Sequence, residues 1–176
     1  MAIVNYRNPS EQRRYRNQLL TIYDNKCPIT GDTENIEAAH IVSWRDCNIY
    51  NSVLCYCPYN GIIMAKRLHR TEFEQYKFTF DYPNYKIIDD SNIEIGLCII
   101  QDNLNLQIFK YRYKKIIMPQ LSLYFIRDHY IQFNNINYND IQDIYTFPDY
   151  LSEVHVVTNK EIRDKDDDII MLPLHV

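Results

Sequence analysis

Two stretches of the chain decide its fold: "EAAHIVSW" at residues 37–44 and "NGIIMAKRLH" at residues 60–69. The first is short and largely apolar, which predicts a β-strand that carries His40. The second opens on Asn60 and Gly61, a pair typical of turns, and runs through an apolar strand into a helical segment with His69. Strand, strand and helix in this order predict a ββα unit in which two histidines and an amide converge.

The residue types in this unit suit the hydrolysis of a phosphodiester. That reaction needs a base to deprotonate water, and it needs charge to be neutralised on the phosphate and the departing oxygen. Histidine can act as the base near neutral pH because its unperturbed pKa is about 6.5. A divalent metal held by the other groups can serve both oxygens.

The order of these motifs resembles the HNH endonucleases, over roughly residues 10–134. The matching positions are Cys27 with Thr30 and Gly31, Glu37 to Val42, Asn60 to Met64, Leu68 with His69, and Phe73. Several parts in a fixed order are more specific than any single motif. Compared with the family pattern, the connection from His40 to Asn60 is long, and one residue is inserted between His69 and Phe73.

The resemblance implies an α+β fold of the ββα-metal type and a set of site residues. It makes His40 the residue that activates water, Asn60 a residue that shapes the site or ligates the metal, and His69 a metal ligand. Many HNH enzymes have an acidic ligand directly before the base, but Ala39 stands there. We therefore expect Mg²⁺, Mn²⁺ or another divalent ion to have few protein ligands, with Glu37 assisting through a water.

The five cysteines are odd in number and scattered, which is typical of a reducing compartment rather than a disulfide framework. Some HNH proteins carry a structural zinc on two Cys-x-x-Cys pairs. Cys27, Thr30, Ala65 and Leu68 take those places here, so a structural zinc is not expected. A substitute zinc site remains an alternative, built from Cys27, Cys47, Cys55 and Cys57.

We expect one domain over residues 1–176, divided by pattern. An N-terminal helix is predicted at 10–26 with Ser10 as its N-cap, the ββα core at 27–80, a β region and a helix at 81–134, and an acidic tail at 135–176. Within the β region, "LQIFKYRY" at 106–113 is predicted as a strand. His129 lies on the apolar stripe of the last helix and is predicted to be a packed core residue.

The net charge of −4 is unevenly distributed. Residues 1–118 carry +2 and residues 119–176 carry −6, so a basic face is compatible with an acidic protein. DNA is the expected partner, with RNA and a homodimer as alternatives. The expected phosphate contacts are Arg13, Arg14, Arg16, Lys66, Arg67 and Arg70; the alternative for this set is a solvated charged face.

The chain lacks an apolar run of about 20 residues and a secretory h-region, which predicts a soluble intracellular protein, cytoplasmic or nuclear. We interpret the sequence as a metal-dependent DNA endonuclease with a histidine general base. The alternative is a catalytically weak or inactive HNH-fold module that binds DNA or has a structural role.

Overall fold

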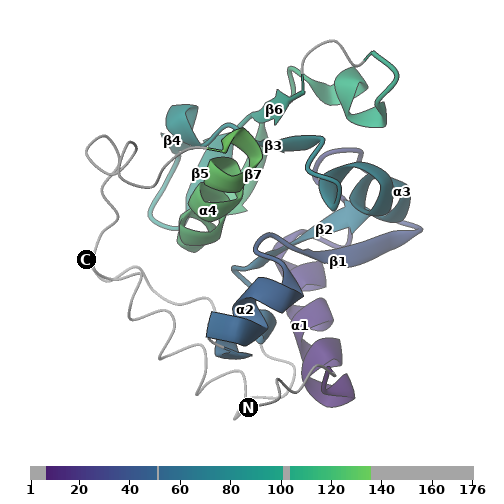
Figure 1. Cartoon of the computed structure of the whole chain (residues 1–176), viewed down its shortest axis with the longest axis vertical. Helices are drawn as coiled ribbons and strands as arrows, with labels where there is room; N and C mark the ends of the chain where they lie inside the picture. The colour runs from purple at the N-terminus through teal and green to yellow at the C-terminus, as the bar shows by residue number, and fades with distance from the viewer. Residues whose placement is uncertain (1–6, 51, 101–103, 136–176) are drawn as a thin grey trace.

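The computed structural model describes residues 7–50, 52–100 and 104–135. These form a mixed helix and strand structure, which confirms the α+β prediction (Figure 1). The helices are α1 (Pro9–Ile22), α2 (Trp44–Tyr50), α3 (Lys66–Leu68) and α4 (Leu123–Asn134). The strands are β1 (Ile36–His40), β2 (Gly61–Ala65), β3 (Phe78–Phe80), β4 (Lys86–Ile87), β5 (Asn92–Ile95), β6 (Leu97–Ile99) and β7 (Ile116–Pro119).

The strands that the structure describes pair only antiparallel, as β1–β2, β3–β6 and β4–β5–β7. Helix α1 lies beside the β1–β2 pair, as Figure 1 shows, and α4 packs against β3. After β2 the chain enters α3 and then a π turn at His69–Phe73. The predicted order of strand, strand and helix is therefore present, with the helix formed by α3 and the π turn.

The N-cap of helix α1 lies two residues before the predicted one. The cap is Asn8, whose Oδ1 accepts the backbone N–H groups of Ser10 (2.9 Å) and Glu11 (3.2 Å), so the assignment of Ser10 was wrong. The helix also stops before residue 26. Asp24 and Asn25 lie in the left-handed region, with φ of 57° and 58°, which a continuing helix does not allow.

Tyr15 of α1 packs directly on the start of β2. Its hydroxyl donates to the carbonyl of Asn60 (2.7 Å), and the side chain is fully buried. A Cβ at Gly61 would lie 2.2 Å from the Tyr15 hydroxyl and 2.7 Å from Cδ1 of Leu19. Glycine is therefore required here because α1 and β2 approach too closely for any side chain.

His129 of α4 is a core residue, as predicted. It is 2% exposed, and its ring stacks between Phe73 (4.5 Å) and Tyr76 (4.8 Å). Its Nδ1 lies 2.6 Å from the Thr79 hydroxyl. Burial lowers the pKa of His129 to about 3, so the ring is neutral at physiological pH.

The strand predicted at 106–113 was wrong, because a buried carboxylate imposes a different structure there. Glu72, which is 4% exposed, accepts the backbone N–H groups of Gln107 (2.7 Å) and Ile108 (2.9 Å). These bonds cap a 3₁₀ turn at Gln107–Tyr111. Glu72 thus anchors this segment to the π turn.

Helix α2 lies within the long connection from His40 to Asn60, where no helix was predicted. Its first turn is capped by Ser43, whose hydroxyl accepts the N–H of Asp46 (3.2 Å). The acidic tail predicted at 135–176 lies outside the described residues from 136 onward. In the part of the chain that the structure describes, no helix is both long and apolar enough to cross a membrane.

Gly61→Ala is expected to lower the free energy of unfolding by about 1–3 kcal/mol, because the new Cβ overlaps Tyr15 and Leu19. Gly96→Ala is the matched control, since the nearest atom there is the flexible Lys115 Nζ at 3.3 Å. Urea unfolding of both variants measures the difference. Equal stability of the two would contradict the close packing of α1 on β2.

Candidate active site

His40 and His69 line one cleft of about 420 Å³, here called the active-site cleft. His40 stands at the end of β1, and His69 opens the π turn. Glu74, the residue after the π turn, and Trp44, the first residue of α2, also line the cleft. The two histidines that the sequence singled out are thus brought to the same cavity.

His40 is held on two sides of its ring and at one nitrogen. Tyr15 stacks on it with centroids 4.7 Å apart and planes inclined by 13°, and Trp44 meets it edge-on at 6.1 Å. Its Nε2 lies 2.7 Å from the carbonyl of Cys55. A carbonyl can only accept, so Nε2 carries the proton and Nδ1 keeps the lone pair that a general base needs.

The surroundings keep His40 uncharged. Burial lowers its pKa to about 4, against an opposing effect of the Cys55 carbonyl, which favours the protonated ring. The positive charge of Arg7, a further residue of the cleft, adds to the lowering. His40 is therefore neutral at pH 7 and able to accept a proton.

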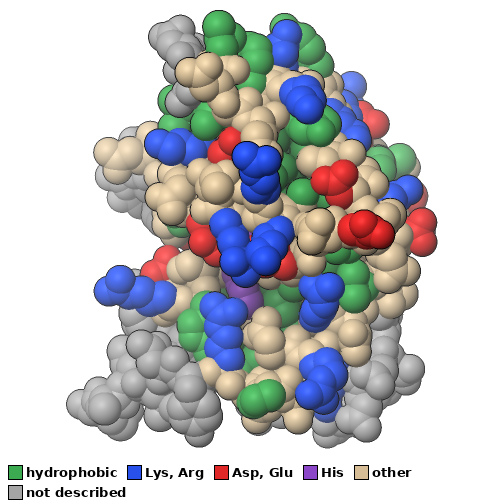
Figure 2. All heavy atoms as spheres, turned by 90° about the vertical axis from the view of Figure 1, so that its right-hand side faces the viewer, with side chains coloured by type: hydrophobic (Ala, Val, Ile, Leu, Met, Phe, Trp, Pro, Cys, Tyr) green, Lys and Arg blue, Asp and Glu red, His purple; other side chains and the backbone are tan. Residues whose placement is uncertain are grey.

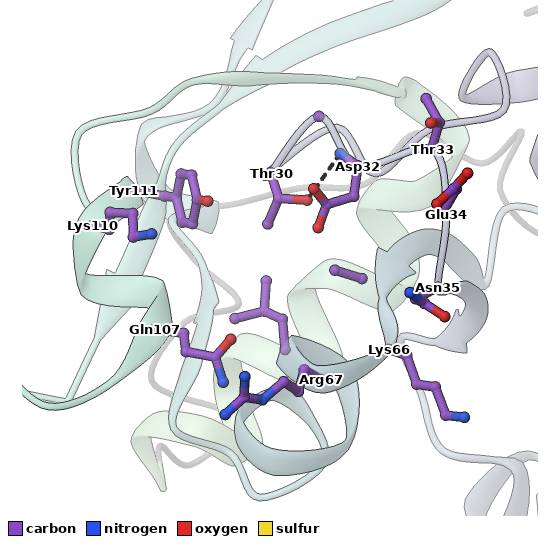
Figure 3. A pocket seen from close by; sticks show the side chains of 13 residues that line it. Thr30, Asp32, Thr33, Glu34, Asn35, Lys66, Arg67, Gln107, Lys110 and Tyr111 are labelled. Carbon is purple, nitrogen blue, oxygen red and sulfur yellow. Dashed lines mark hydrogen bonds between the residues drawn. The ribbon is translucent and has the colours of Figure 1, made fainter.

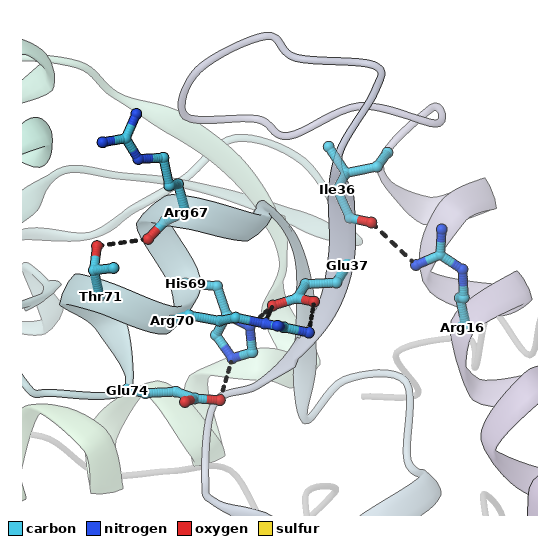
Figure 4. A network of polar contacts seen from close by, with 8 residues as sticks. All are labelled: Arg16, Ile36, Glu37, Arg67, His69, Arg70, Thr71 and Glu74. Carbon is cyan, nitrogen blue, oxygen red and sulfur yellow. Dashed lines mark hydrogen bonds and ion pairs between the residues drawn. The ribbon is translucent and has the colours of Figure 1, made fainter.

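His69 sits between two carboxylates (Figure 4). Its Nδ1 is 2.6 Å from Oε1 of Glu37, and its Nε2 is 3.2 Å from Oε1 of Glu74. The imidazole is 12% exposed and Glu74 is 55% exposed, so Glu74 lies on the solvent side. This is the arrangement of a ligand histidine whose second nitrogen is oriented by a carboxylate.

Glu37 contacts two residues, His69 and Arg70. Arg70 donates from Nε and Nη2 to both oxygens of Glu37, each at 3.1 Å, in addition to the His69 contact. Burial raises the pKa of Glu37, but the bonds from His69 and Arg70 outweigh it, and the net pKa lies below the usual value. Both oxygens of Glu37 are thus already engaged, and its position suits orienting the His69 ring better than the predicted assistance to a metal through a water.

Asn60 does not face the cleft, and its predicted role as a metal ligand is incompatible with its burial. The residue is 0% exposed. Its Oδ1 accepts the N–H of Val42 (2.7 Å), while Nδ2 contacts the carbonyls of Val42 (3.1 Å) and Leu54 (3.2 Å) and the thiol of Cys47 (3.1 Å). The structure supports the other predicted role, in which Asn60 shapes the site.

Ala39 is also turned away from the cleft. Successive side chains of a strand point to opposite faces, and it is Ala38 and His40 that line the cleft. Ala39 is 0% exposed, opposite Ile62 of β2. A carboxylate at position 39 would therefore point into the core and not into the cleft.

Ala39→Asp is expected to destabilise the protein by on the order of 3 kcal/mol, because it places an uncompensated carboxylate in the core. Ala38→Asp makes the same chemical change one residue earlier, at a half-buried position in the cleft, and should cost much less. Thermal unfolding of both variants tests the strand's orientation. A larger loss for Ala38→Asp would mean that the two faces of β1 are reversed.

No cluster of three or more His, Cys, Asp or Glu side chains suited to a metal ion occurs within residues 7–50, 52–100 and 104–135. Cys27, Cys47, Cys55 and Cys57 are thus not assembled as a zinc site. The donors that do fit a hard divalent ion are the carboxylate of Glu74 and Nε2 of His69, which face each other in the cleft. Two protein donors leave room for water and phosphate oxygens.

A second cleft, of about 690 Å³, lies between α3 and the segment at residues 30–35 (Figure 3). Thr30, Ala65 and Leu68, three of the positions compared above with zinc ligands, line it together. None of the three can ligate zinc, and Cys27 instead accepts the Thr30 N–H at Sγ (3.4 Å). Among the described residues that line this second cleft there is no histidine, so they do not offer the imidazole groups that the active-site cleft has.

Basic side chains surround a histidine on the face that includes α3 and the β1–β2 pair (Figure 2). Of the residues predicted to contact phosphate, Arg13, Lys66, Arg67 and Arg70 are exposed. Arg14 and Arg16 are half-buried, and Arg16 donates to the carbonyl of Ile36 at 3.4 Å.

The sequence did not single out three charged residues that line the cleft, Arg7, Arg45 and Glu74. For Glu74 a signal was present, the additional residue between His69 and Phe73. The sequence held no such signal for Arg7 and Arg45, because both lie outside the motif and only the folded chain places them at the cleft.

A histidine at the end of one strand and a histidine between carboxylates after the next form a ββα site whose side chains suit phosphodiester chemistry. Residues 27–81 match the family model described as HNH endonuclease. The match covers the ββα unit and less than half of the chain, and it confirms the resemblance to this family for that unit. It supports a nuclease-type function. No curated protein and no solved structure gave a significant match.

Proposed function

We propose that the protein is a divalent-metal-dependent DNA endonuclease in which His40 is the general base. The observation that carries the proposal is the position of His40 in the same cleft as His69, with Nε2 bound to a carbonyl and Nδ1 left to accept a proton. The family match over residues 27–81 supports the same reaction class.

In the reaction, Nδ1 of His40 takes a proton from water as its oxygen attacks phosphorus, and the bond from phosphorus to the leaving oxygen breaks. The Cys55 carbonyl then stabilises the imidazolium through its bond to Nε2. Tyr15 and Trp44 restrain the ring, so the base does not have to be ordered during the reaction.

His69 is the proposed metal ligand, oriented by Glu37 and, through Glu37, by Arg70. A divalent ion held there supplies charge neutralisation at the phosphate and the leaving oxygen. Arg7 and Arg45 line the same cleft and are placed to bind phosphate groups that flank the scissile bond. The exposed Lys66 and Arg67 extend the basic surface along α3.

His40→Ala is expected to reduce metal-dependent nicking or cutting of supercoiled plasmid by about 10²–10⁴ fold, because the base is removed. DNA affinity should stay close to that of the wild type, since His40 is not a phosphate contact. Gel assays with Mg²⁺ or Mn²⁺, and with EDTA, give the rate, and a binding assay on uncut DNA gives the affinity.

Full cleavage by the His40→Ala protein would remove His40 from the base role. DNA binding by the wild type without any cleavage would instead identify the alternative, an inactive HNH-fold module. A structured RNA substrate in the same assay distinguishes a preference for RNA.

The pH dependence of kcat/KM follows from the lowered pKa of His40. The base works when neutral, so the rate should rise with pH as the ring loses its proton and level off above its pKa. Because that pKa is about 4, the rise in kcat/KM should lie well below pH 6.5, which is about the pKa of an unperturbed histidine. A rise centred at or above pH 6.5 would contradict the neutral state of the half-buried His40.

A further inference from the structure

We propose that Glu74 is a second protein ligand of the metal, paired with His69 and brought to it by the π turn. The inference rests on the proposed function, which needs a divalent ion at His69. It adds the anionic oxygen that a carboxylate before the base supplies in many HNH enzymes and that Ala39 cannot supply here.

The positions of the two carboxylates around His69 are the first argument. Nδ1 of His69 is 2.6 Å from Oε1 of Glu37, so that contact already engages one nitrogen of the ring. The other nitrogen, Nε2, is 3.2 Å from Oε1 of Glu74. An imidazole nitrogen and a carboxylate oxygen can both ligate a divalent ion, so the pair offers two donors to one cation.

The distance itself suits a metal. Ligand atoms about 2.1 Å from an octahedral ion, at right angles to each other, are about 3.0 Å apart. Nε2 of His69 and Oε1 of Glu74 are 3.2 Å apart, so both can bind one ion with little movement. Glu74 is 55% exposed, which leaves the remaining positions open to water and phosphate oxygens.

The π turn explains how two residues five positions apart come together. The N–H of Glu74 donates to the carbonyl of His69 at 2.9 Å, an i→i+5 bond. In an α-helix the residue one turn beyond His69 is Phe73, at i+4. Here Phe73 is 2% exposed and packs against Phe78 and Phe80 at the inner side of the cleft, and the additional residue in the turn brings the Glu74 carboxylate beside His69.

The charges of the neighbours separate the roles of the two glutamates. Arg70 binds both oxygens of Glu37, so the negative charge of Glu37 is already compensated. Glu74 brings its charge to the cleft on the other side of the His69 ring. Glu37 is thus a positioning residue and Glu74 a ligand.

The test is the Mn²⁺ affinity of the free protein without DNA, measured by electron paramagnetic resonance or calorimetry. Glu74→Gln keeps the shape and removes the charge, and it should weaken Mn²⁺ binding about tenfold or more. His69→Gln should do the same. Glu94→Gln, a charge-matched change on β5, should leave the affinity unchanged.

A double variant, Glu74→Gln with Gln75→Glu, restores the charge of the cleft but moves the carboxylate by one residue. Its Mn²⁺ affinity should remain as low as that of Glu74→Gln. A ligand must stand at one position, whereas a purely electrostatic effect of the negative charge would tolerate a shift by one residue. Recovery of affinity in the double variant would overturn the inference, as would wild-type affinity in Glu74→Gln or no Mn²⁺ binding by the wild type. If His69→Gln weakens binding and Glu74→Gln does not, the inference fails while the proposed function stands.

Discussion

The buried amide of Asn60 is the interaction on which the rest of the site depends. Its oxygen and nitrogen hold both backbone polar groups of Val42, and its nitrogen also reaches the carbonyl of Leu54. Val42 follows His40 by two residues, so these bonds fix the direction in which the chain leaves β1. Leaving one such buried group unpaired costs about 1–3 kcal/mol. The amide therefore holds together the two ends of the long connection between β1 and β2, next to His40. Its role is structural, because it is buried away from the cleft.

Further residues around the amide hold the two histidines in place. The next residue, Gly61, pairs with His40 across the two strands and admits Tyr15, whose ring then packs against the imidazole. Across the cleft, Glu37 on β1 orients His69. Each histidine is thus held by a residue that does not react, which is how a site keeps its geometry before substrate arrives. The cost is that buried groups such as Asn60 tolerate little change.

The sequence predicted the parts of the site that a linear pattern can carry. His40, His69 and the order of strand, strand and helix follow from apolar periodicity and the family motif. Three local structures depend on side chains that hydrogen-bond to the backbone: the start of α1, the start of α2, and the turn at Gln107–Tyr111. Candidate caps that lie close together in the sequence, such as Asn8 and Ser10, cannot be told apart by residue type alone. Asn60 signalled a turn, and only the fold reveals its buried amide network. The additional residue between His69 and Phe73 was a signal for Glu74, but an insertion alone does not show that the chain makes a π turn there and brings Glu74 to His69.

The central claim is that the fold presents His40 as a neutral base with its proton on Nε2. Nitrogen-15 NMR of the histidine rings measures this directly, because the chemical shifts of the two ring nitrogens report which one is protonated. The structure predicts a protonated Nε2 and a bare Nδ1 at pH 7, with no titration of the ring until the pH is well below 6.5. A ring protonated on Nδ1 at neutral pH, or one that becomes charged near pH 6.5, would contradict the claim.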